Sequence, residues 1–126
     1  MKLSDDDRAV LAGLGERGAE LVDRAVGWCA INSGSRNLQG LEAQRAALEP
    51  ALVALPGQLE RLPLQPSLEI GADGREREQA HTDALRLTVR PDAPVQVVLT
   101  GHYDTVYGAD TRFTEVRPRD DGALNG

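Results

Sequence analysis

The chain has 126 residues, a formal net charge of −6 and only 3% aromatic residues. This length is sufficient for one domain with a hydrophobic core, and the scarcity of aromatic side chains means that the core has to be aliphatic. The negative charge and the lack of a basic patch argue against nucleic acid and anionic membranes as partners.

The amino terminus and the cysteine content indicate the compartment. Residues 1–7 are acidic and lack the apolar stretch of a secretory signal, and no apolar run approaches the ~20 residues that span a bilayer. We therefore expect a cytoplasmic protein. Cys29 is the only cysteine, which excludes an intramolecular disulfide and a cysteine metal cluster. Its place on an apolar helical face predicts a buried structural thiol.

Two amphipathic helices are predicted in the first half of the chain. Ser4 is a suitable N-cap, and three aspartates follow it where the helix dipole favours negative charge. Apolar residues recur at helical spacing as far as Trp28. Three glycines lower the helix propensity in the middle of this pattern (Gly13, Gly15 and Gly18). The pattern therefore predicts either one bent helix or two short helices. A second amphipathic pattern covers residues 38–55, with a kink or break expected near Glu49 because Pro50 removes an intrahelical hydrogen bond.

The loop of residues 32–35, Asn-Ser-Gly-Ser, lies between these helical patterns and has two interpretations. It is either the end of one helix followed by the cap of the next, or a segment that lies under an active site. The first interpretation is favoured because the loop contains no good metal ligand.

The segments that follow predict strands and turns. Pro63 and Pro66 reduce residues 59–70 to an edge strand or irregular structure. Residues 71–74 are a turn signal, and residues 75–79 form a solvated run of charges.

A hairpin is predicted from residue 85 onward. Apolar and polar residues alternate over 85–90, which is typical of a strand buried on one face. Residues 91–94 turn the chain into the apolar run 95–100, so these two strands should pair. The predicted fold class is α/β, with the two amphipathic helices packed on a mixed β-sheet. His81 has no carboxylate or cysteine at ligand spacing and is expected to be an exposed structural histidine.

The apolar run ends in Gly101-His102-Tyr103-Asp104, which carries the candidate chemistry. Residues two apart on an extended backbone point the same way, so the Asp104 carboxylate can reach the His102 ring. A metal-bound histidine usually donates its other ring N–H to a carboxylate. We therefore predict that His102 is a metal ligand and that Asp104 is the catalytic residue that orients it. The alternative is that the two residues only form a hydrogen bond that closes a loop.

Residues 97–106, Val-Val-Leu-Thr-Gly-His-Tyr-Asp-Thr-Val, resemble the first metal motif of the di-zinc aminoacylase/carboxypeptidase family of metallopeptidases. This group includes glutamate carboxypeptidase, acetylornithine deacetylase and succinyl-diaminopimelate desuccinylase. Residues 28–40 resemble the first loop of the family, 85–91 the strand before the metal strand, and 113–126 the approach to the second metal motif.

The resemblance implies a zinc-dependent hydrolase of amide or peptide bonds in N-acyl or peptidyl amino acids, of carboxypeptidase or deacylase type. It implies two zinc ions that lower the pKa of a shared water to about 7 and polarise the scissile carbonyl. The bridging aspartate of the family, its Glu-Glu pair, a further carboxylate and its last histidine are not in this sequence. Residues 1–126 are therefore expected to be the amino-terminal segment of a zinc-peptidase-like catalytic domain. This segment should bind zinc weakly and should be inactive alone.

The sequence also contains other acids and is compatible with two rival functions. The carboxylates after Val106 are expected to be exposed loop acids (Asp110, Glu115, Asp120 and Asp121). One rival function is a non-catalytic α/β binding or interaction module in which residues 101–104 are structural. Another is a mononuclear metal hydrolase with a different ligand set around His102. The expected partner is a small amino-acid-derived or peptide substrate, and self-association is a further hypothesis because sheet edges are left uncovered.

Overall fold

The computed structural model describes residues 2–111 and 115–125. These residues form two compact units. One consists of Met1–Ala30 with Glu115–Gly126, and the other of Ile31–Thr114. The candidate motif and the loop of residues 32–35 lie in the second unit, which is the one that bears on function.

The first unit contains helices α1 (Asp5–Glu16) and α2 (Gly18–Cys29). The Ser4 hydroxyl accepts from the Asp7 amide at 3.1 Å, and the Asp7 carboxylate accepts from the Ser4 amide at 2.8 Å, so both form a capping box. The Ser4 hydroxyl also donates to the Asp7 carboxylate at 2.7 Å, and this bond, followed by the one from the Ser4 amide, lowers the pKa of Asp7. The predicted N-cap is confirmed. Of the two alternatives for this region, two short helices form, and they meet at Arg17.

The apolar faces of α1 and α2 are not buried. Neither helix contains a buried residue, and Cys29 is exposed, so the prediction of a buried thiol is wrong. A helix can bury an apolar stripe only against another layer. The other elements of this unit are the two-residue strands β5 (Arg117–Pro118) and β6 (Leu124–Asn125), which are too small to provide that layer.

The second unit begins with the loop of residues 31–37 and helix α3 (Leu38–Val53). The Asn37 side chain caps this helix by accepting from the Gly40 amide at 3.1 Å. The helix passes through Pro50 and ends at Val53, with Ala54 as its C-cap, so of the predicted kink or break near Glu49 the break does not form. Glu49 instead bridges two cations, Arg45 on the same helix and Arg61 on the neighbouring strand.

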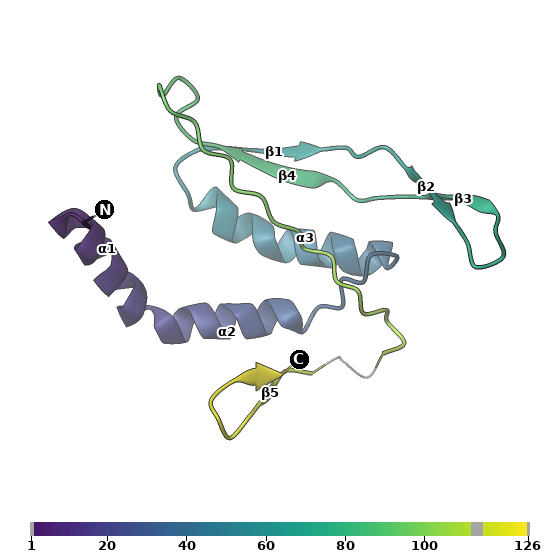
Figure 1. Ribbon diagram of the computed structural model, residues 1–126, viewed down its shortest axis with the longest axis horizontal. Helices are drawn as coiled ribbons and strands as arrows, with labels where there is room; N and C mark the ends of the chain where they lie inside the picture. Colours follow the sequence, from purple (N-terminus) through teal and green to yellow (C-terminus); the bar gives the residue numbers. More distant parts are fainter. Residues whose placement is uncertain (1, 112–114, 126) are drawn as a thin grey trace. The chain divides into compact units, whose positions relative to one another are not determined.

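Two antiparallel pairs of strands follow α3. Strand β1 (Gln58–Leu62) pairs with β4 (Ala84–Thr88), and α3 lies against β1 (Figure 1). Strand β2 (Ser67–Ile70) pairs with β3 (Glu76–Gln79). The prolines between β1 and β2 interrupt the pattern as predicted.

The β2–β3 turn also forms as predicted. The Gly74 amide donates to the Gly71 carbonyl at 2.9 Å, and Gly74 has a positive φ of 74°, which glycine adopts without strain. The charge run that starts at Arg75 is exposed for the most part, as expected, but its residues 76–79 form a strand.

The predicted hairpin between residues 85–90 and 95–100 is wrong. The partner of β4 is β1, and residues 95–100 have no regular secondary structure and belong to no strand pair of the described chain. The turn between the two segments does form. The side-chain amide of Gln96 donates to the backbone carbonyl oxygens of Arg90, Pro91 and Ala93 at 3.2, 3.0 and 2.9 Å. These bonds stabilise the turn, while β4 is paired on one edge with β1.

The apolar side chains of this segment are consequently open to solvent. Val98 is 82% exposed and Leu99 is 92% exposed, and the valines at 95 and 97 are three-quarters exposed. Among the described residues, Leu41 is the one buried hydrophobic residue. The expected aliphatic core has therefore not formed, because the predicted mixed sheet that would carry it is absent from the described part of the chain.

The observed fold is a mixed α/β structure of helices followed by small antiparallel two-stranded sheets. The helix and strand content agrees with the predicted class, and the predicted packing of two helices on one mixed sheet does not. Over the residues that the structure describes, no helix has the length and apolar character needed to cross a membrane.

We predict that residues 95–99 cause self-association. An apolar segment with unpaired backbone groups is a template for pairing with another chain. Val98→Lys should lower the average mass measured by light scattering at high protein concentration. Val53→Lys, which places the same charge at another exposed valine at the end of α3, should not. A wild-type chain that stays monomeric across a wide concentration range would contradict this prediction.

Candidate functional site

His102 and Asp104 lie against each other in the structure. The Nδ1 atom of His102 is 3.1 Å from Oδ1 of Asp104 and 2.8 Å from the backbone carbonyl oxygen of the same residue. The two-residue spacing on an extended backbone therefore produces the contact that the sequence predicts.

The surroundings of Nδ1 define the protonation of the ring. Both neighbours of Nδ1 are oxygen acceptors. The favoured tautomer therefore carries its proton on Nδ1, and the Nδ1–H donates to Asp104. The lone pair of the neutral ring is then on Nε2. The His102 side chain is 82% exposed, so this lone pair is open to solvent and to ligands.

The loop of residues 32–35 lies directly beside this pair. Gly34 and Thr105 form a parallel bridge, in which the Thr105 amide donates to the Ser33 carbonyl at 2.9 Å. The Ser35 amide donates back to the Thr105 carbonyl at 3.0 Å. The favoured interpretation, a plain connection between two helices, is therefore incomplete, because the loop also packs under the candidate motif.

Ser35 contacts the motif through its side chain as well. Its hydroxyl donates to Oδ2 of Asp104 at 2.7 Å, while the other carboxylate oxygen faces His102. The Thr105 carbonyl lies 3.1 Å from the same hydroxyl. The shorter bond to a charged acceptor is the stronger of the two, so the hydroxyl proton is assigned to Asp104.

Two asparagines hold the loop in place. The side-chain amide of Asn32 donates to the backbone carbonyl oxygens of Tyr107 and Gly108, both at 3.3 Å. These bonds connect the loop to the chain after the motif. The side-chain amide of Asn37 donates to the backbone and side-chain oxygens of Asn32 at 3.0 and 3.1 Å. Since Asn37 also caps α3, the position of the loop is tied to the start of that helix.

Tyr103 anchors the opposite side of the motif. Its hydroxyl donates to the Asp83 carbonyl at 2.6 Å and lies 2.7 Å from the Thr82 hydroxyl, which can donate in return. These two residues directly precede β4. Two consecutive residues of the motif are therefore held by different parts of the chain, Tyr103 by the segment before β4 and Asp104 by the loop before α3.

The hydrogen bond from Ser35 lowers the pKa of Asp104, and the hydrogen bond and charge of His102 act in the same direction. A carboxyl group whose pKa is lower in the folded state stabilises that state when it is ionised. This contribution is complete above the ordinary pKa of an aspartate and is lost as the pH falls through the lowered value. Solvent screening keeps it small, because the Asp104 side chain is 44% exposed.

The described residues do not form a complete metal site. Over this part of the chain no group of three or more His, Cys, Asp or Glu side chains could hold a metal ion. A catalytic zinc needs about three protein ligands, and the geometry here offers Nε2 of His102. His81, expected to be structural, is exposed, and its Nε2 lies 2.9 Å from the Ser67 hydroxyl.

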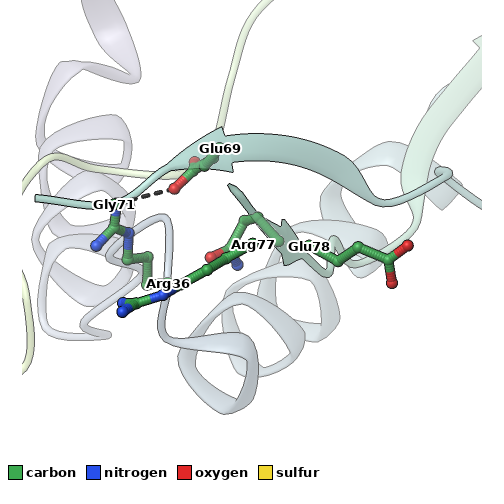
Figure 2. A pocket seen from close by; sticks show the side chains of 6 residues that line it. Arg36, Glu69, Gly71, Arg77 and Glu78 are labelled. Carbon is green, nitrogen blue, oxygen red and sulfur yellow. Dashed lines mark hydrogen bonds and ion pairs between the residues drawn. The ribbon is translucent and has the colours of Figure 1, made fainter. Parts of the chain in front are cut away.

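A shallow pocket elsewhere in the second unit lies next to the β2–β3 hairpin (Figure 2). Arg36 reaches Glu69 at 2.8 Å, and Arg77 reaches Asp73 at the same distance. Because each guanidinium already has a carboxylate, the pocket has no excess charge to attract an ionic ligand. Neither His102 nor Asp104 lines it.

The site residues that the sequence did not predict are Ser35 and the two asparagines of the loop. None of them is a metal ligand, and each acts on residues distant in the sequence, so spacing within the motif could not indicate them. The available signal was the concentration of small and amide side chains over residues 32–37, which is typical of a loop with extensive side-chain to backbone bonding.

Comparisons with protein-family models, with curated proteins and with solved structures gave no match for this chain.

We predict that Gly40→Ala destabilises the second unit. Gly40 lies in α3, where alanine would normally be favoured over glycine by up to about 1 kcal/mol. Here, however, an added Cβ would overlap the Asn32 carbonyl oxygen and the Asn37 amide. The expected net loss is about 1–3 kcal/mol, measured by urea unfolding of the amide signals of residues 31–111.

Gly13→Ala is the matched control, because nothing lies within 4 Å of a Cβ at that position of α1. It should leave the second unit unchanged and favour α1. Equal behaviour of the two variants would show that the contact between Gly40 and the loop does not form.

Proposed function

We propose that this chain carries the first metal motif of a zinc-dependent hydrolase of amide or peptide bonds. The substrates would be N-acyl or peptidyl amino acids, cleaved by a carboxypeptidase or deacylase reaction. The observation that supports this most is the geometry of His102, with Nδ1 directed at Asp104 and an exposed Nε2. This is the arrangement by which proteins present an imidazole to a metal ion.

Within this proposal the chain contributes one zinc ligand and its support. His102 would bind the metal through Nε2, and Asp104 would fix the tautomer and the orientation of the ring. Since the described residues lack a complete ligand set, the other ligands and the general base would come from residues outside them. No step of the reaction is assigned to the described residues beyond this binding and orientation.

An interaction module is the second candidate function, and a different observation favours it. The exposed apolar segment 95–99 lies immediately before the motif, and large exposed apolar surfaces in soluble proteins mark sites of association. In this case residues 101–104 would only close a loop, and His102 would not bind a metal.

A zinc titration followed by NMR separates the two candidates, because the chain contains two histidines and both are exposed. Zinc should shift the His102 ring signals first, and this effect should be lost in His102→Ala and retained in His81→Ala. The binding should be weak enough that dialysis removes the metal, and the chain alone should not hydrolyse an N-acyl amino acid.

Equal shifts at both histidines, or no shift at His102, would contradict the assignment of His102 as a ligand. Zinc near one equivalent after dialysis, lost in His102→Ala, would instead show that the ligand set is complete without further residues.

A further inference from the structure

We infer that Ser35 is a positioning residue, which sets the tautomer and orientation of His102 through the Asp104 carboxylate. This inference deepens the proposed function of the same site, but its evidence and its test do not require bound zinc. It concerns a chain of two hydrogen bonds, from Ser35 to Asp104 at 2.7 Å and from His102 to Asp104 at 3.1 Å.

The two bonds use different oxygens of the carboxylate. Oδ2 accepts from the Ser35 hydroxyl and Oδ1 faces Nδ1 of His102, so the hydroxyl holds the plane of the carboxylate in the orientation that the imidazole needs. The Asp104 side chain is 44% exposed and has no arginine or lysine partner among the described residues. Without the hydroxyl, rotation of the carboxylate toward water would compete with the contact to His102.

The position of the Ser35 hydroxyl does not depend on the hydroxyl itself. The Ser35 backbone is held by the hydrogen bond that its own N–H donates to the Thr105 carbonyl at 3.0 Å. The hydrogen bond from the Thr105 N–H to the Ser33 carbonyl holds the neighbouring residue. The loop is held further by Asn32 and Asn37. Removing the hydroxyl should therefore leave the backbone in place and remove only the restraint on Asp104.

The consequence for the site is a specific form of His102. With the carboxylate held at Nδ1, the proton stays on that nitrogen and the lone pair stays on Nε2, where a metal ion or a proton can be accepted. The Asp104 backbone carbonyl oxygen, 2.8 Å from Nδ1, accepts the same proton, so the Ser35 hydroxyl adds to this preference by keeping the charged acceptor in place. A histidine that lost the carboxylate contact would populate the other tautomer more, in which Nε2 carries the proton and cannot bind a metal.

The experiment measures the ratio of the two neutral tautomers from the ring nitrogen chemical shifts of the full chain, at a pH where both imidazoles are neutral. His102 of the wild type should be mainly in the form with the proton on Nδ1. Ser35→Ala should lower the ratio of the Nδ1–H form to the Nε2–H form by about three- to tenfold. Ser35→Thr keeps the hydroxyl and should retain the wild-type ratio.

Ser67→Ala is the matched control, because Ser67 stands beside the other histidine, His81. It should change the signals of His81 and leave those of His102 unchanged. In an Asp104→Ala background, Ser35→Ala should have no further effect on His102, because the proposed action passes through the carboxylate.

An unchanged ratio in Ser35→Ala would overturn the inference, and so would a Ser35→Thr variant that shifts as far as Ser35→Ala. An additive effect of Ser35→Ala in the Asp104→Ala background would show that Ser35 acts by another route. Because the ratio is measured without zinc, a chain that shows the expected shifts and binds no zinc would support the role of Ser35 and reject the proposed function alone.

Discussion

The parallel backbone pairing between Gly34 and Thr105 is the constraint on which the candidate site depends. It joins the loop before α3 to the end of the His102 motif, two segments that are far apart in the sequence. A side chain at Gly34 would bring its Cβ to 2.5 Å from the Tyr107 carbonyl oxygen, so the close approach requires glycine. Once this pairing exists, Ser35 lies next to Asp104 without any further adjustment.

The support of the motif comes from polar bonds and not from a hydrophobic core. Ser33 is buried at the pairing, and the side-chain amides of Asn32 and Asn37 donate hydrogen bonds to neighbouring backbone carbonyl groups. Buried polar groups are stable only when their hydrogen bonds are made, which gives such a network one defined geometry. A rigid support of this kind suits a histidine whose ring must present one particular nitrogen.

The features that the sequence predicted correctly are local ones. The Ser4 cap, the turn at residues 71–74 and the contact between His102 and Asp104 each involve residues within four positions of one another. Turn chemistry, capping and the two-residue period of an extended chain are sufficient for these.

The features that could not be predicted depend on distant partners. The alternation in β4 indicates a strand but does not identify β1 as its partner, so the adjacent apolar run was paired with it incorrectly. The apolar faces of α1 and α2 indicate helices that need a covering layer, and the described residues of their unit do not provide one. The role of Ser35 likewise depends on a pairing that no local pattern encodes.

The exposed segment 95–99 is where the structure differs most clearly from what the sequence pattern predicts. Continuous apolar strands of this kind are normally buried on both faces of a parallel sheet, whereas here Val98 and Leu99 are open to solvent. The same segment leads directly into the candidate ligand. Its exposure therefore supports the proposal that it is a surface for association.

The most direct test of this account is amide hydrogen exchange at Ser35 and Thr105, whose N–H groups close the pairing between the loop and the motif. We predict that both amides exchange slowly and at similar rates, because a single opening of the pairing exposes both. Exchange of either amide at the rate of an unstructured chain would show that the loop does not support the motif, and the geometry proposed for His102 would then be wrong.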